Sequence, residues 1–226
     1  APASLLERTA RAKIPGLMLS GSSGTIWQGR AQQLNFGWLQ LSEIEWRISP
    51  WALLIGKLKT DFQFGGTRDF RGSLNVNAGV SEQKLTHVDL KIPASRLQAF
   101  INLPGVQLNG DFYLQADEIV LSDQQLRRVI GRLQWSGAMV QTPLGQPPLG
   151  SYAVDVRTEE SGAIVGDIKD LEGVLDLRGQ LHYAHPMASI SATTRADLPE
   201  QLDRFFRAVG RKEGDRYLVS WQQEIR

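Results

Sequence analysis

Histidines and acidic pairs are the side chains of this sequence that could bind a metal ion or transfer protons. His182 and His185 lie around a turn expected at residues 183–186, and the chain has only three histidines and no cysteine. A zinc site needs three or four ligands, and no third histidine or cysteine lies near this pair. We therefore interpret both as turn histidines and expect no metal ion and no other cofactor.

Two acidic pairs and one serine pair are the other arrangements with catalytic residue types. Asp117-Glu118 and Glu159-Glu160 occupy adjacent positions, and adjacent residues of a strand point to opposite faces of a sheet. The serines at residues 21–24 lack the Gly-x-Ser-x-Gly spacing of a nucleophile elbow. No glycine-rich pattern for binding phosphate is present. We expect that the chain is not an enzyme.

The elements that position these residues are mostly strands. Hydrophobic residues recur at every second position along the chain, as in strands with one buried face. Many such runs begin just after a glycine; Leu74 and Val76, for example, follow Gly72. Glycine permits turns and bulges. The sequence therefore predicts a mainly β fold: a long twisted antiparallel meander in two packed layers.

Helical patterns are few and short. Residues 198–209 have the spacing of an amphipathic helix, and Gly210 follows as a stop. The apolar face of this helix would hold Leu198, Leu202, Phe205, Phe206 and Val209. Another face would hold Arg204, Arg207 and Arg211. Residues 93–101 predict a short helix, and residues 49–55 predict a single turn.

Two stretches of the chain share a pattern at an offset of 89 residues. Residues 15–21 and 104–110 both read Pro-Gly-apolar-x-Leu-polar-Gly, and the same offset places Trp46 onto Trp135. The match between these points is poor, so a true duplication and the repeated use of Pro-Gly corners both stay open. We predict one β domain over residues 1–226, which a duplication would divide into 13–103 and 104–226.

Composition excludes several classes of protein. With 226 residues, 42% hydrophobic content and a net charge of +1, the chain is neither disordered nor a strongly basic nucleic-acid binder. Its longest uncharged apolar stretch, residues 51–56, is far below the roughly 20 residues of a membrane-spanning helix. Because the first residue is Ala rather than Met, we expect that a targeting segment has been removed.

Tryptophan is the one residue type in notable excess. Six are present, and five lie in or beside predicted strands: Trp27, Trp38, Trp46, Trp51 and Trp135. A broad aromatic core is the simplest interpretation. The alternative is that Trp27 or Trp38, both next to glycine-containing turns, is exposed and anchors a partner. The arginine face of the last helix likewise either faces solvent or contacts an acidic lipid or partner.

The end of the chain is a candidate edge strand. In residues 216–226, Tyr217, Val219 and Trp221 alternate with Leu218 and Ser220, and no covering element follows. An unpaired edge offers backbone groups for strand addition by a partner. Residues 17–31, around Trp27, are a second candidate edge. We predict binding at one of these edges. In the alternative, both edges are paired internally and the arginine face binds.

Five segments, in order over nearly the whole chain, resemble the type II secretion system protein N family. The most specific is LSGSSGTIWQGRA at residues 19–31. The others are IEWRISPWALLIGKL at 44–58, LGSY at 149–152, GVLDLRGQL at 173–181 and GDRYLVSW at 214–221.

This resemblance implies a β-rich periplasmic domain held at the bacterial inner membrane by one N-terminal helix that is absent from this sequence. It also implies a noncatalytic scaffold or assembly role in exporting folded proteins across the outer membrane. The partners would be other envelope proteins of the secretion machine, with no nucleic acid. The resemblance supplies no catalytic residue.

A periplasmic carrier of lipid or another hydrophobic ligand fits the strand pattern as well. Its sheet would present one apolar face as an open groove. The two hypotheses differ in whether side chains fill the inner face of the sheet or leave that face open.

Overall fold

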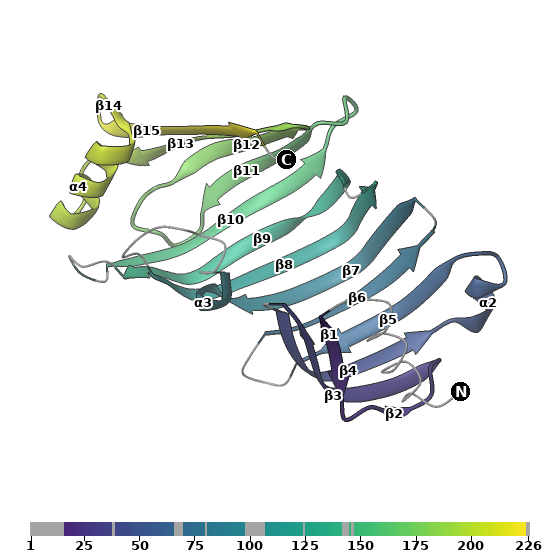
Figure 1. The fold of residues 1–226 in the computed structure, drawn as a ribbon. Coiled ribbons are helices and arrows are strands. Elements are labelled where there is room, and N and C mark those ends of the chain that lie inside the picture. The colour runs from purple at the N-terminus through teal and green to yellow at the C-terminus, as the bar shows by residue number, and fades with distance from the viewer. Residues whose placement is uncertain are drawn as a thin grey trace. The chain divides into compact units, whose positions relative to one another are not determined.

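Strands make up most of the described structure (Figure 1). The computed structural model describes residues 16–37, 39–65, 70–79, 81–97, 107–123, 125–141, 145 and 147–224. Its contacts divide the chain into two units, residues 1–91 with 116–126 and residues 92–115 with 127–226. We call them unit 1 and unit 2.

Unit 1 is built from antiparallel strands that pair in chain order, β1-β3-β4-β5-β6-β7, with β2 paired to β3. The elements are β1 (Leu17–Ser20), β2 (Ser23–Gly24), β3 (Gln28–Phe36), β4 (Leu39–Ile48), α2 (Pro50–Leu53), β5 (Leu58–Phe64), β6 (Arg71–Ala78) and β7 (Glu82–Pro93). Figure 1 shows α2 at the turn between β4 and β5.

One face of the unit 1 sheet carries its core. The alternation of β4 turns Ile44 and Trp46 to this face, where they are 1% and 8% exposed. Leu19 of β1 and Phe64 of β5 belong to the same cluster, although two strands separate β1 from β5 in the pairing order. Glu43, with a φ of 50°, interrupts the regular pairing of β3 with β4. Such an irregularity bends a sheet, which helps distant strands share one core.

Unit 2 is also built from antiparallel strands, which pair in the order β9-β10-β11-β12-β13-β15-β14. Strands β8 (Gln107–Ser122) and β9 (Gln125–Gln141) contribute residues to both units. The other elements are α3 (Ala94–Leu97), β10 (Pro148–Thr158), β11 (Ile164–Asp170), β12 (Arg178–Ala184), β13 (Met187–Arg195), α4 (Glu200–Val209), β14 (Arg211–Glu213) and β15 (Arg216–Glu224).

The core of unit 2 lies between α4 and the sheet. Leu202 and Phe206 of the helix are 8% and 9% exposed, and Tyr217 of β15 is fully buried. The rings of Phe206 and Tyr217 stack with their centroids 6.2 Å apart. Tyr152 of β10 completes this aromatic layer.

These observations confirm a mainly β antiparallel meander with a C-terminal amphipathic helix. The three described helices hold four, four and ten residues, against fifteen strands. The single turn at α2 occurs as expected. Of the short helix predicted at residues 93–101, α3 covers Ala94–Leu97, while Pro93 ends β7 and residues 98–101 lie outside the described residues.

Three details differ from the sequence predictions. Within each unit the described strands pair into one continuous sheet rather than into two separate sheets. Two α4 residues expected on its apolar face, Phe205 and Val209, are 51% and 47% exposed, because the apolar α4 side chains that enter the unit 2 core are Leu202 and Phe206. Trp51, expected in an aromatic core, is 76% exposed.

Candidate functional site

The described residues contain no group of three or more His, Asp or Glu side chains that could hold a metal ion. His182 lies on β12 opposite Ser189, and His185 lies in the turn before β13. The Tyr183 hydroxyl is 3.4 Å from Nδ1 of His185. Over the part of the chain that the structure describes, no helix is both long and apolar enough to cross a membrane. The described side chains predicted to contact a partner lie on β15, on the arginine face that begins on α4, and in the bend that holds Trp27.

The first such surface is the outer edge of β15. Its whole length pairs with β13 on one side, from Arg216 opposite Arg195 to Glu224 opposite Met187. On the other side, the three residues of β14 pair only with residues 216–218. No described strand pairs with that side of residues 219–224. We call this segment the β15 edge.

The backbone alternation identifies which groups of the β15 edge are unpaired. The Gly214-Asp215 turn joins β14 to β15, and Gly214 has the positive φ, 62°, that the first position of such a hairpin requires. Glu213 and Arg216, which flank a two-residue turn, hydrogen-bond to each other. Even-numbered residues of β15 therefore direct their N–H and C=O groups to the β14 side. The edge groups are those of residues 220, 222 and 224.

The side chains predicted for partner contact on β15 lie in different environments. Trp221 is 44% exposed and Val219 is half-buried. Tyr217 is fully buried beneath α4, so its side chain does not offer a contact surface. All three share one face of β15: Tyr217 lies within the cluster that includes Leu202 and Phe206 of α4, Val219 packs against this cluster and is partly buried, and Trp221 is exposed.

A polar contact fixes α4 over β15. The Tyr217 hydroxyl donates a hydrogen bond of 2.6 Å to Oδ1 of Asp203, and Arg207 forms an ion pair of 2.8 Å with Oδ2. The hydrogen bond from Tyr217, followed by the ion pair with Arg207, holds the pKa of Asp203 below its ordinary value. The same hydrogen bond raises the pKa of Tyr217, because the neutral hydroxyl is the donor. Arg207 is therefore part of the helix attachment.

The other two arginines predicted for partner contact point to solvent. Arg204 is exposed and forms an ion pair with Glu200 one turn earlier on α4. Arg211, at the start of β14, is exposed and has no ion pair with a described residue. The arginine face thus divides into one attachment residue and two residues available to a partner.

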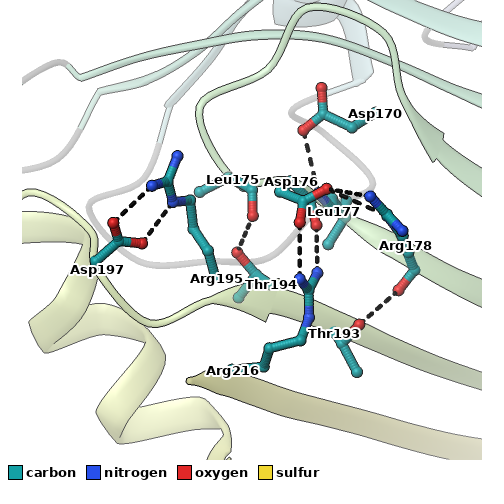
Figure 2. Close-up of polar contacts among 10 residues, drawn as sticks. All are labelled: Asp170, Leu175, Asp176, Leu177, Arg178, Thr193, Thr194, Arg195, Asp197 and Arg216. Carbon is teal, nitrogen blue, oxygen red and sulfur yellow. Dashed lines mark hydrogen bonds and ion pairs between the residues drawn. The ribbon is translucent and has the colours of Figure 1, made fainter.

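A network of charged residues holds the start of β15 against the loop before β12 (Figure 2). Arg216 donates to Oδ2 of Asp176 at 2.7 Å and to the Asp176 carbonyl oxygen at 2.6 Å. These contacts, with Arg178 as a second partner, lower the pKa of Asp176. Thr194, fully buried on β13, donates to the carbonyl oxygen of Leu175 at 2.6 Å. The β15 edge therefore extends from a firmly held base.

Of the two tryptophans predicted as partner anchors near the N-terminus, the structure describes Trp27. Trp27 is 37% exposed in the bend between β2 and β3. Its backbone N–H donates to Oγ1 of Thr25 at 3.2 Å, and its carbonyl accepts from Ile48 at 2.6 Å. The indole N–H of Trp46 anchors this bend by donating to Ile26 at 3.2 Å. Trp38 lies outside the described residues.

Sequence reasoning missed a polar hollow on unit 1. A cavity of about 810 Å³ lies along β3, β4, β5 and β6. Its lining includes Trp46, Phe62 and Leu74 together with four charged residues, Arg30, Glu45, Arg47 and Asp61. The charged residues occupy the positions that alternate with the core residues of the same strands. The alternation of each strand could have indicated this polar face.

A free sheet edge beside a charged helix is a surface on which another protein could add a strand. The sequence profile of the family described as "Type II secretion system (T2SS), protein N" matches residues 15–220. The chain belongs to this family, which confirms the resemblance seen in its sequence. The family is a component of a bacterial protein-transport machine.

Individual relatives carry the same name, type II secretion system protein N. The protein of Vibrio cholerae is 30% identical over 65% of this chain, and the alignment spans 59% of that relative's own length. The protein of Aeromonas hydrophila is 24% identical over 99% of this chain and 91% of its own. That of Pectobacterium carotovorum is 25% identical over 80% and 70%. No solved structure matches the chain.

Proposed function

We propose that this chain is a noncatalytic scaffold or assembly component of the type II secretion system, located on the periplasmic face of the inner membrane. Membership of the protein N family supports a place in the machine. Other envelope proteins of that machine are its expected partners. In this role the chain catalyses no reaction, and the residues predicted to contact a partner serve as binding surfaces.

The observation that best supports binding by strand addition is the unpaired side of the β15 edge. Backbone groups of residues 220, 222 and 224 face away from β13, and residues 220–224 are exposed. A partner that adds a strand there gains main-chain hydrogen bonds along the whole edge. Trp221 stands beside these groups and supplies an apolar anchor, since aromatic residues contribute strongly to protein interfaces.

A proline scan of β15 tests strand addition. Ser220→Pro removes an N–H donor from the free side of the strand, where proline is tolerated. Ser220→Ala keeps that donor and is the matched control. We expect Ser220→Pro to retain the thermal melting of the unaltered chain but to lose capture of purified secretion components and protein export. Ser220→Ala should retain both.

Two further variants separate the β15 edge from the alternative surfaces. Val219→Pro removes a donor that faces β13, so it should lower the melting temperature. Trp27→Ala probes the bend before β3. If Ser220→Pro and Trp27→Ala bind fully, while reversing the charges of Arg204 and Arg211 abolishes binding, the partner uses the helix face and strand addition at β15 is wrong.

A second candidate function, carriage of a lipid or hydrophobic ligand, is favoured by one observation in unit 2. Beyond α4, the face of the sheet that includes Val219 continues as a cross-strand row of Trp221, Ile190 and Leu181, in which Ile190 and Leu181 are only half-buried. Native mass spectrometry after purification tests this function. A bound lipid that is lost in Leu181→Glu would favour it, and a ligand-free chain would contradict it.

A further inference from the structure

The turn that carries α2 exposes four large apolar side chains, more than any other run of five described residues. We call residues 50–56 the α2 turn. The exposed fractions are 76% for Trp51, 43% for Leu53, 76% for Leu54 and 71% for Ile55. Ala52, 6% exposed, is the residue that packs inward. Clustered exposed apolar side chains mark interaction sites, whereas single ones do not.

A hydrogen-bonded backbone holds these side chains outward. Pro50 occupies the start of the helix, where its fixed φ is suited. The N–H of Lys57 donates to the Ala52 carbonyl at 2.9 Å, and the N–H of Ser49 donates to the Lys59 carbonyl at 2.9 Å. Gly56, with a φ of 70°, reverses the chain. The exposure is therefore a property of the folded turn.

Positive charge surrounds the base of the α2 turn. Lys57 and Lys59 follow it directly, and Arg47 lies on the neighbouring strand β4; all three are exposed. No acidic residue occurs in the sequence between residues 46 and 60. Glu45 and Asp61 flank this stretch; Asp61 lies opposite Arg47 in the sheet and accepts a hydrogen bond of 2.7 Å from Asn75. An apolar tip with a basic base is complementary to a membrane surface that carries anionic headgroups.

We propose that the α2 turn inserts into the headgroup region of an anionic lipid bilayer. Trp51 suits the boundary between headgroups and acyl chains, Leu54 and Ile55 reach the apolar side of it, and the lysines meet lipid phosphates. A stable protein interface buries on the order of 1,000 Å² or more, which exceeds what a single short turn provides. This contact does not depend on the proposed scaffold function.

Flotation of the purified chain with lipid vesicles tests the insertion. We expect binding to vesicles of phosphatidylcholine with phosphatidylglycerol. The double variant Trp51→Ala/Leu54→Ser should bind about tenfold more weakly, because two of the inserted side chains are lost. Leu171→Ser, which removes a 44% exposed apolar side chain from unit 2, is the matched control and should bind normally.

The lysines give a separate readout. Lys57→Gln/Lys59→Gln should weaken binding to the anionic vesicles and reduce its sensitivity to salt, while leaving binding to pure phosphatidylcholine unchanged. If the double apolar variant unfolds, Ile55→Ser alone provides the same test at a 71% exposed position.

Several results would overturn the proposal. These are no binding of the unaltered chain to anionic vesicles, binding by the double apolar variant equal to that of the unaltered chain, or an equal loss in Leu171→Ser. Sedimentation analysis adds one more. If the double apolar variant abolishes self-association of the chain and leaves lipid binding intact, the α2 turn contacts a second copy and not a bilayer.

Discussion

The α2 turn and α4 are both helical segments that carry large apolar side chains, and these side chains are exposed in one and partly buried in the other. In α4, Leu202 and Phe206 are buried against β15, while in α2 only Ala52 is buried and Trp51 is left 76% exposed. The length of each helix explains part of this difference. Ten residues give α4 a full face with which to cover Tyr217, whereas four residues give α2 no such face.

The comparison shows that apolar character alone does not assign a residue to the core. α4 is attached by stacking and by the contact of Tyr217 with Asp203. The α2 turn is fixed by backbone hydrogen bonds, which hold its shape without burying its side chains. Substitutions in α4 should therefore change folding stability, and substitutions in the α2 turn should change binding.

The largest difference is expected between Phe206→Ala and Trp51→Ala. Phe206 is buried in the unit 2 core, so its truncation should cost about 3–5 kcal/mol of unfolding free energy. Trp51 makes little buried contact, so Trp51→Ala should stay within about 0.5 kcal/mol of the unaltered chain. Chemical denaturation of both variants measures this. Equal losses would mean that the α2 turn belongs to a core, which would contradict the comparison.

Acid should release α4 and leave the α2 turn unchanged. The pKa of Asp203 is lowered in the folded chain by its contacts with Tyr217 and Arg207. Its contribution to stability is therefore present above the ordinary carboxyl pKa of 3.8 and is lost as the pH falls through the folded value. Residues 50–56 contain no titratable side chain.

Hydrogen exchange of the backbone amides at a series of pH values measures this difference. After correction for the intrinsic rate, protection of α4 should fall below about pH 4, while protection of the α2 turn should follow only the global stability. Asp203→Asn keeps an acceptor for Tyr217 and removes the charge, so it is the control. An unchanged acid response in Asp203→Asn would assign the release to another carboxylate.

Most of the strands could be predicted from the sequence, because the period of two belongs to each strand by itself. The spacing of Leu202 and Phe206 likewise sufficed to find α4. Which of Tyr217, Val219 and Trp221 is covered could not be predicted, since it depends on where α4 lies over β15. The contact of Asp176 with Arg216 joins residues forty positions apart, and no local pattern indicates it.

The candidate surfaces, like the fold, could be predicted from the sequence only in part. The free side of β15 was predictable in outline from alternation at the end of the chain. The share of that edge covered by β14 depends on the Gly214-Asp215 hairpin. The same hairpin sets which residues direct their N–H groups to the free side, so proline at residue 220, not at residue 219, tests strand addition. The exposure of Trp51 was not predictable, because buried and exposed tryptophans next to strands share the same local pattern.

The smallest expected difference in stability lies within α4 itself, between variants of Arg204 and Arg207. Arg204 pairs with Glu200 in solvent, and both side chains are more than 60% exposed. Arg204→Ala should therefore change the unfolding free energy by no more than about 0.5 kcal/mol. Arg207 pairs with Asp203, whose side chain is only 17% exposed and also accepts from Tyr217. Arg207→Ala should lower the unfolding free energy measurably more, because it removes a partner from the contact that attaches the helix.

Thermal melts of both variants at low and high salt check this order. If Arg204→Ala destabilises the chain as much as Arg207→Ala, the solvent-facing side of α4 contributes to its attachment, and loss of partner binding in Arg204 variants would no longer identify a binding surface.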